Sequence, residues 1–441
     1  MADENPSELN SQEEEQMMKE FDEHLLDLAP YSSTPAEMKK YQAMAKSDIE
    51  ARGVINMERG FTNFLDPYWN KIANIDFMMA RGAKDMSYQD DASEELTKEI
   101  IRLHDRIDNA NTIDKYVVVG NGVRQVMLAA IRAHAVQTGL KIVYADPPHF
   151  FLFKDMVESI GLEFCNDPDR FDPETMINII TSPSNPVGIK GPQNIANVNI
   201  WDLCYNWPQY DDVSVFMNDD VQIFGLAKAT GHASSRIGWA LVKDGMTAWL
   251  MREFINVTTG GVSLEAQFRA ECEIAAQNQL LDQKKEKGVF TLEGGKAPND
   301  KDVFTFGRKA LNDRWNEIHW LNLMLPDHPT GIEIMNCAGM FAWCQLKDPQ
   351  LDVPGTKMTA AHVMMEKFNI QVMDGSLCHP DGRDMFRLNL GCDDKTFAKF
   401  IEVMKAAAPN SAAIRQSAFN TKMCTENPSK PCDGKSDCCK I

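Results

Sequence analysis

The sequence reads Phe224-Gly-Leu-Ala-Lys228-Ala-Thr-Gly-His-Ala-Ser-Ser-Arg236 at its centre. The apolar run Val221–Leu226 leads into the lysine and is typical of a buried strand. A lysine in such a setting is costly unless its charge is used or neutralised, and its amine can form an imine with an aldehyde. Arg236 could bind a phosphate that arrives with the aldehyde. The stretch therefore suggests a site for pyridoxal 5′-phosphate (PLP); the competing interpretation is a surface lysine beside an ordinary loop.

The composition is that of a globular protein with a large core. The chain has 441 residues, of which 44% are hydrophobic and 25% are charged, enough for more than one domain. Its formal net charge of -19 argues against nucleic acid or an anionic membrane surface as partner, because both select clustered basic residues. No apolar run has the length needed to span a bilayer.

The cysteines and the first residues favour a cytoplasmic location. Most cysteines are scattered through apolar segments, as expected for free thiols in a reducing compartment. The acidic start, Met-Ala-Asp-Glu, lacks the basic and apolar regions of a secretory signal. The four cysteines at 424, 432, 438 and 439 match no metal-binding spacing, so we predict no metal site.

Short apolar runs alternate with amphipathic segments from residue 94 onward. The expected strands are 116–120, 141–145, 176–181, 198–200, 221–226 and 237–242. This alternation predicts an α/β fold with a mostly parallel sheet covered by helices on both faces. Ligands of such sheets bind at the carboxyl ends of the strands, where the unusual segments of this chain fall.

A different pattern begins at residue 303 and predicts a smaller α+β domain. Its expected strands are 331–334, 340–346 and 385–390, and its helices are 303–323, 357–368 and 394–407. The predicted division has four parts. An N-terminal helical segment, 1–85, packs with the small domain, and a large PLP-binding domain spans 86–302. The small domain spans 303–408, and a flexible tail spans 409–441.

Asp202, Tyr205 and Asn185 follow expected strands and suit a pyridoxal ring. A carboxylate such as that of Asp202 would keep the pyridine nitrogen protonated, which makes the ring an electron sink. Tyr205 and Asn185 could hydrogen-bond the phenolic oxygen of the ring. Asp202 could instead cap a helix, and Asn-Pro is also ordinary turn chemistry.

The segment Gly120-Asn121-Gly122-Val123-Arg124 lies between a strand and a helix. Its backbone N–H groups and the helix dipole could bind a phosphate. A dinucleotide fingerprint is the competing interpretation, but Gln125 stands where that motif has its third glycine.

Phe150 and Arg387 complete the candidate site. Phe150 follows a buried run and could stack on the cofactor or belong to the core. Arg387 lies in an apolar strand, and a buried arginine needs an anion. A substrate α-carboxylate would supply one, and so would a local aspartate or glutamate.

Residues 224–244 closely resemble the signature of the alliinase and tryptophan–pyruvate aminotransferase family, which are fold-type-I PLP enzymes. The similarity spans roughly residues 53–408. It includes Thr181-Ser-Pro-Ser-Asn-Pro-Val-Gly, Asp202-Leu-Cys-Tyr-Asn-Trp-Pro-Gln-Tyr, Met86-Ser-Tyr88 and Phe306-Gly-Arg-Lys-Ala-Leu-Asn-Asp-Arg-Trp. The family is dimeric with sites at the interface, so the resemblance implies a homodimer.

The resemblance also implies a role for each candidate residue. Lys228 would be the catalytic Schiff-base lysine and Arg387, with Asn185, the ligand of the substrate carboxylate. The implied cofactor-binding residues are Tyr88 of the neighbouring subunit, Asn121, Gly122, Val123, Arg124, Phe150, Asn185, Asp202, Tyr205, Lys228 and Arg236.

The chain departs from the family pattern around the phosphate. Hydroxyl residues are usual three positions and one position before the lysine, where this chain has Gly225 and Ala227. A threonine is usual where Arg124 stands. Arg124 could compensate, because a charge-assisted hydrogen bond is about twice as strong as a neutral one; alternatively, cofactor binding is weakened.

The expected function is transfer of an amino group from an aromatic or apolar L-amino acid to a 2-oxo acid such as pyruvate. A carbon–sulfur lyase that cleaves S-substituted cysteine sulfoxides is the first alternative. A PLP-fold protein without turnover is the second. The aminotransferase is favoured because the sequence contains no match to the epidermal-growth-factor-like module of plant alliinases.

Overall fold

A computed structural model describes ten stretches of the chain. They are residues 53–58, 62–68, 92–188, 190, 195–213, 221–286, 302–321, 330–336, 339–352 and 358–408. Most of the predicted N-terminal segment 1–85 and the whole predicted tail 409–441 lie outside these stretches. No helix among the described residues is long and apolar enough to cross a membrane.

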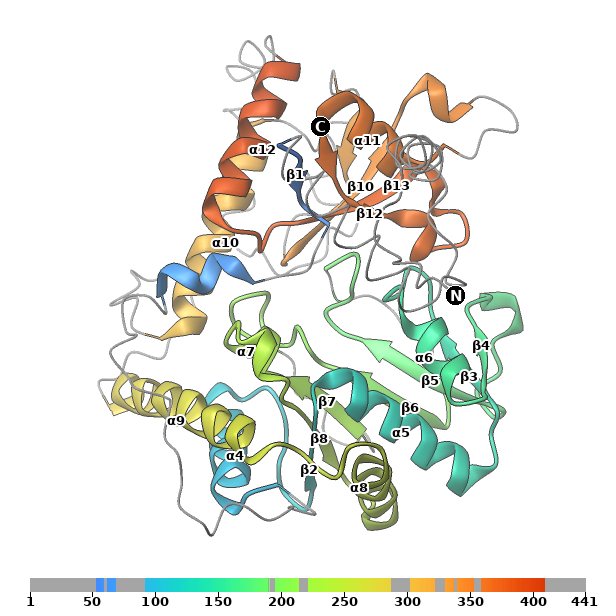
Figure 1. Cartoon of the computed structure of the whole chain (residues 1–441), viewed down its shortest axis with the longest axis vertical. Coiled ribbons are helices and arrows are strands. Elements are labelled where there is room, and N and C mark those ends of the chain that lie inside the picture. Colours follow the sequence, from blue (N-terminus) through green and yellow to red (C-terminus); the bar gives the residue numbers. More distant parts are fainter. Residues whose placement is uncertain are drawn as a thin grey trace, which may run out of the picture.

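A seven-stranded sheet forms the lower half of the molecule in Figure 1. Its strands, in spatial order, are β2 (Tyr116–Gly120), β8 (Gly238–Val242), β7 (Val221–Gly225), β6 (Val198–Asp202), β5 (Met176–Thr181), β3 (Ile142–Ala145) and β4 (Glu163–Cys165). Only β8 runs against the others, so the prediction of a mostly parallel sheet is confirmed. The short strand β4 was not predicted.

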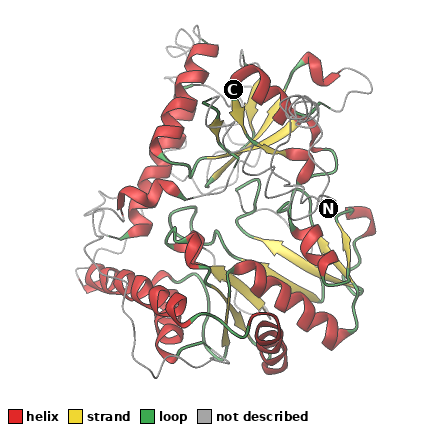
Figure 2. Cartoon of the chain, in the orientation of Figure 1, coloured by secondary structure: helices red, strands yellow, loops and turns green. Residues whose placement is uncertain are grey.

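Helices cover both faces of this sheet (Figure 2), which explains why its strands read as continuous apolar runs. One face packs on α5 (Val123–Thr138), α6 (Phe153–Ser159) and α8 (Gly245–Thr259). The other packs on α4 (Glu94–Ile107) and α9 (Leu264–Glu286). Gly260 and Gly261, which have φ of 65° and 88°, separate α8 from α9.

A four-stranded antiparallel sheet forms the upper half. Its order is β12 (Met373–Asp374), β13 (Met385–Asn389), β10 (Phe341–Leu346) and β9 (Ile332–Ile334). The accompanying helices are α10 (Val303–Trp320), α11 (Ala360–Phe368) and α12 (Asp394–Ala407). The short strand β1 (Ile55–Asn56) pairs with β11 (Ile370–Gln371) beside this sheet. The predicted domain boundaries stay a prediction.

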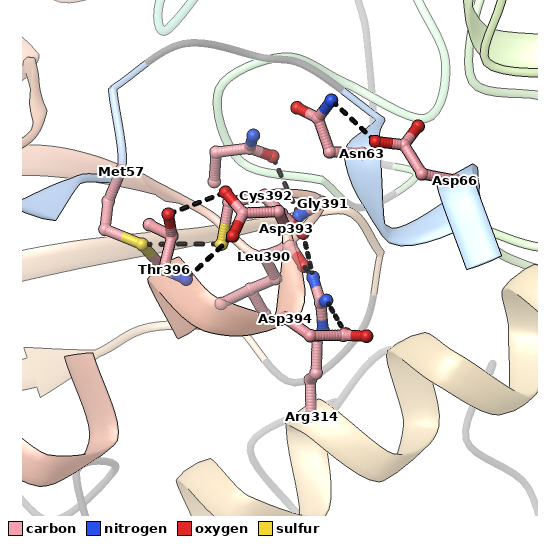
Figure 3. Close-up of polar contacts among 11 residues, drawn as sticks. Met57, Asn63, Asp66, Arg314, Leu390, Gly391, Cys392, Asp393, Asp394 and Thr396 are labelled. Atoms are coloured by element: carbon pink, nitrogen blue, oxygen red, sulfur yellow. Dashed lines mark hydrogen bonds and ion pairs between the residues drawn. The ribbon is translucent and has the colours of Figure 1, made fainter. Parts of the chain in front are cut away.

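Arg314 of α10 binds the loop before α12 and the first residue of α12 (Figure 3). Its guanidinium donates to the carbonyls of Leu390 and Cys392 and forms an ion pair with Asp394 at 2.7 Å. Cys392 Sγ in turn contacts Met57 Sδ at 3.6 Å. These contacts hold the loop after β13, and so limit the movement of the strand that carries Arg387.

Candidate active site

Lys228 lies in the short helix α7 (Leu226–Ala229), directly after the carboxyl end of β7. Its backbone carbonyl accepts hydrogen bonds from Gln209 Nε2 and Tyr210 Oη, both at 2.9 Å. Its Nζ lies 5.6 Å from the centre of the Tyr205 ring. Burial lowers the pKa of the Lys228 amine to about 8, so about a tenth of the amine is uncharged at pH 7.

Asp202 ends the neighbouring strand β6 and is buried. Its Oδ1 accepts the N–H of Cys204 at 3.2 Å. Burial raises the pKa of this carboxyl, and the contacts with Cys204 and the charge of Lys228 act in the opposite direction. A cationic N–H group placed beside Asp202 would therefore stabilise the ionised form of this buried carboxyl.

Asn185, Tyr205 and Arg387 form a chain of hydrogen bonds between the two halves. Asn185 Nδ2 donates to Tyr205 Oη at 3.3 Å, and Arg387 Nη1 donates to Asn185 Oδ1 at 2.7 Å. All three side chains are buried, and burial raises the pKa of the Tyr205 hydroxyl well above its usual value. Asn185 therefore contacts both the residue expected at the ring oxygen and the residue expected at the substrate carboxylate.

Arg387 is a buried cation that forms no ion pair within the described part of the chain. It is 2% exposed, its Nη2 donates to the Glu58 carbonyl at 2.6 Å, and its Nε has no hydrogen-bond partner among the residues that the structure describes. The Glu58 carboxylate accepts instead from Gln371 Nε2 at 2.6 Å. The Arg387 guanidinium lies 4.2 Å from the centre of the Phe341 ring, and burial lowers its pKa. The alternative of a local salt bridge is thus not found among the described residues.

Arg236 and the first residue of α5 lie together at the same end of the sheet. The N-cap Gly122 has φ of 81° and no side-chain cap. A Cβ at Gly122 would lie 2.3 Å from Arg236 Nη2, so only glycine allows this approach. Arg236 is exposed, has φ of 53° and donates to the Ala233 carbonyl at 3.1 Å. A helix N-terminus beside a guanidinium attracts an anion.

The other expected phosphate and ring contacts are arranged differently. The Asn121 side chain points to Gln125, Thr259 and the Gly261 carbonyl, and its backbone N–H donates to Gln125 Oε1 at 2.8 Å. The Arg124 guanidinium lies 5.9 Å from the centre of the Phe150 ring. Tyr88 lies outside the described residues, and its role stays a prediction.

The sequence reasoning missed four contributors: Gln209 and Tyr210 hold the Lys228 carbonyl, and Glu58 and Phe341 hold Arg387. Gln209 and Tyr210 belong to the segment 202–210 that carried the resemblance, so that segment could have signalled them. Glu58 contacts Arg387 through its backbone carbonyl, a group that every residue type has, so the sequence could not indicate this contact.

Similarity to known proteins extends over most of the chain. A family model described as "Allinase" matches residues 55–407. Tryptophan aminotransferase-related protein 1 of Oryza sativa subsp. japonica is 28% identical over 84% of this chain and 87% of its own. Tryptophan aminotransferase-related protein 2 of the same plant is 30% identical over 62% of this chain. Alliin lyase of Allium cepa var. aggregatum is 28% identical over 58% of this chain. The matches span only 57% and 59% of the latter two proteins.

Solved structures show the fold. A putative kynurenine aminotransferase from Saccharomyces cerevisiae superposes with a TM-score of 0.59 at 14% identity, covering 86% of this chain and 97% of the other. An aspartate aminotransferase from Thermotoga maritima gives 0.56 at 16% identity, covering 83% and 96%. The expected fold, that of fold-type-I PLP-dependent aminotransferases, is therefore confirmed.

Alliinases and fold-type-I aminotransferases are PLP enzymes, and the residues described above fit this cofactor. Gly122 leaves room beside Arg236 that a Cβ would fill, at a helix N-terminus suited to phosphate. Asp202 is a buried carboxyl suited to a pyridinium nitrogen, and Lys228 follows the strand next to it. The Nε of Arg387, which has no partner in the described stretches, suits a carboxylate.

Proposed function

Since this chain belongs to the alliinase family, we propose that it is a PLP-dependent aminotransferase. Its donor is an L-amino acid with an aromatic or apolar side chain, and its acceptor is a 2-oxo acid such as pyruvate. The observation that carries the proposal is the buried Arg387, which lacks a carboxylate partner among the described residues and is linked through Asn185 to Tyr205. That position needs an anion that arrives with the substrate.

PLP, when bound, supplies an electron-withdrawing ring that makes the α-hydrogen of an attached amino acid acidic. Asp202 would hold a proton on the pyridine nitrogen, because a buried carboxylate is stabilised by a neighbouring positive charge. Asn185 and Tyr205 would hold the phenolic oxygen, and Arg236 with the first turn of α5 would bind the phosphate.

Lys228 would hold the cofactor covalently and then move the substrate proton. Its lowered pKa leaves an uncharged amine available near neutral pH, as both a nucleophile and a base require. The hydrogen bonds of Gln209 and Tyr210 to its carbonyl fix the backbone from which the side chain extends. The amine could therefore take the proton from the substrate α-carbon and return it to the cofactor.

Arg387 would orient the substrate by binding its α-carboxylate. Two planar N–H donors match two carboxylate oxygens, so a bound amino acid would be held in one orientation relative to Lys228. An aromatic or apolar donor side chain agrees with the buried cluster around Trp343, Met373 and Cys378, against which Phe151 and Val187 pack. Trp343 and Met373 pair with Arg387 on the two neighbouring strands and so share its face of the sheet.

A carbon–sulfur lyase is the second candidate, supported by the relatives named alliin lyase. The same residues would serve it, because elimination of a sulfur group from Cβ also begins with loss of the α-hydrogen. We further propose a homodimer with shared sites, which light scattering of the purified protein would test. A protein that holds PLP without turnover stays the third possibility.

The experiment is reduction of the PLP-loaded protein with borohydride, followed by peptide mass spectrometry. We expect the pyridoxyl group on Lys228 and no label in the variant Lys228→Ala. A labelled protein that forms product from an L-amino acid only when a 2-oxo acid is present is an aminotransferase. Pyruvate and ammonia formed without a 2-oxo acid would identify the lyase, and absence of both reactions with a broad amino-acid set would leave the protein without turnover.

A further inference from the structure

Three glycines lie side by side across adjacent strands, at the end of the sheet that carries α5. Gly238 of β8 pairs with Gly120 of β2 on one side and with Gly225 of β7 on the other. We call these three residues the glycine row. Glycine in a strand often marks a place where another part of the chain approaches closely. Here the first turn of α5, which lies across the face of the sheet in Figure 1, makes that approach.

Each position of the row would clash with α5 if it carried a Cβ. At Gly238 the Cβ would lie 2.5 Å from the backbone nitrogen of Val123. At Gly225 it would lie 2.5 Å from Val123 Cγ2, and at Gly120 it would lie 2.8 Å from Val126 Cγ2. The start of α5 therefore lies so close to the sheet that none of the three positions has room for a Cβ.

Val123 has little freedom to avoid these contacts by rotating. A β-branched side chain has a restricted χ1, and the backbone of Val123 is itself held against Gly238. The space at position 225 is therefore filled by Val123 Cγ2. This accounts for Gly225, where the resemblance leads us to expect a hydroxyl residue: any side chain there would meet the valine.

The close packing of α5 on the glycine row also sets the distance between the first turn of α5 and Arg236. The Arg236 guanidinium packs on Gly122, the residue before Val123, and β7 leads into Lys228. The attraction of a helix N-terminus for an anion falls off within one turn. Moving the first turn away from the sheet would therefore shift the phosphate contacts relative to Lys228.

We propose that the glycine row is a positioning element for the phosphate site, and that Val123 and Gly225 are one size-coupled pair within it. The pair sets how tightly the cofactor phosphate binds; the inference rests on the proposed PLP function. Removing both methyl groups of Val123 would leave its Cβ 3.9 Å from a Cβ at position 225, which is an ordinary contact. The clash at Gly238 involves backbone atoms and would remain.

The test uses the full chain in five forms: wild type, Gly225→Ala, Val123→Ala with Gly225→Ala, Gly238→Ala, and Val123→Ala with Gly238→Ala. Two quantities are measured on the apo proteins, the dissociation constant of PLP and the rise in melting temperature with inorganic phosphate. We expect Gly225→Ala to weaken PLP binding at least tenfold, about 1.4 kcal/mol, and to reduce the phosphate effect. The Val123→Ala change should restore both quantities for Gly225→Ala and neither for Gly238→Ala.

Gly331→Ala is the matched control for lost stability alone. Gly331 directly precedes β9 of the small sheet, and a Cβ there would meet the Lys347 carbonyl oxygen at 2.3 Å. This variant should melt earlier yet keep the phosphate effect. Equal PLP binding by wild type and Gly225→Ala, or no rescue by Val123→Ala, would overturn the inference. Failure of the wild type itself to bind PLP would instead overturn the proposed function.

Discussion

Arg387 donates a 2.7 Å hydrogen bond to Asn185 across the boundary between the two sheets. Asn185 follows β5 of the large sheet, and Arg387 lies in β13 of the small one. The bond therefore joins the residue expected at the substrate carboxylate to the residue expected at the cofactor. Small movements between the two sheets would alter both contacts at once.

Arg387→Lys should raise the KM for the amino-acid donor about ten- to a hundredfold, because the loss of one charge-assisted hydrogen bond costs ~1.5–3 kcal/mol. PLP binding should change little, since Arg387 is not among the residues proposed to hold the cofactor. Arg383→Lys is the matched control, because Arg383 also donates to backbone carbonyls but those of Met358 and Leu351. Equal KM values for the two variants would contradict the role of Arg387.

Asn185→Asp should impair the donor reaction more than Asn185→Ala does. The new carboxylate would lie where Asn185 Oδ1 now accepts from Arg387 and would give the buried cation an internal anion. The substrate carboxylate would then compete with a permanent partner, so KM should rise for every amino-acid donor. Steady-state kinetics of both variants test this, and a lower KM for the aspartate variant would be the opposite result.

Lys228→Met should stabilise the apo protein at neutral pH. Burial lowers the pKa of Lys228 from 10.5 to about 8, so the folded state disfavours the charged amine that the unfolded chain carries. The stability that goes with this lowered pKa is present above pH 10.5 and is lost as the pH falls through 8. The methionine variant should therefore melt a few degrees above wild type at pH 7, and the gap should close towards pH 10.5.

Lys243→Met is the control for that experiment, because Lys243 is exposed at the end of β8. It should alter the melting temperature little at either pH. A Lys228→Met protein that melts below wild type at pH 7 would show that the amine is not held at an energetic cost. Thermal unfolding of the apo proteins, followed by circular dichroism, measures the difference.

His104→Gln should cost ~1–3 kcal/mol of stability at pH 7 by leaving buried polar groups unpaired. Trp239 Nε1 donates to His104 Nε2 at 2.9 Å, and His104 Nδ1 lies 2.7 Å from Asn109 Oδ1. Asn109 also bonds the Asn206 carbonyl, in the segment after Asp202. These hydrogen bonds thus connect the segment after Asp202 to α4 and β8.

The pH dependence gives this prediction a specific sign. Burial lowers the pKa of His104 from 6.5 to about 4, so its contribution is present above pH 6.5 and is lost as the pH falls through 4. The gap in urea-unfolding free energy between wild type and His104→Gln should shrink over that interval. His379→Gln, at a partly exposed histidine, should show a much smaller gap, and a gap that widened with acid would refute the assignment.

The strands and their carboxyl-end residues could be predicted because their signals are local. Asp202 and Lys228 each follow an apolar run, and parallel strands bring such ends to one edge. The partners of Arg387 could not be predicted, because Asn185 lies 202 positions away in sequence and Glu58 contributes only a carbonyl. The crowding of Gly225 by Val123 likewise depends on how closely α5 approaches the sheet.

The direction of each side chain was also beyond the sequence. Asn121 and Arg124 lie where a phosphate-binding segment was expected, yet the Asn121 side chain bonds Thr259 and Gly261, and Arg124 lies over Phe150. A motif identifies backbone positions, whereas rotamers follow from neighbours that are distant in the sequence.

A single-turnover reaction is the sharpest test of whether the protein is an aminotransferase. PLP-loaded protein is mixed with an aromatic L-amino acid in the absence of any 2-oxo acid, and the products are counted per bound PLP. We expect one 2-oxo acid per site, loss of the visible cofactor absorption, and its return when pyruvate is added. Continuous release of ammonia, or no 2-oxo acid from protein that holds PLP on Lys228, would contradict this expectation.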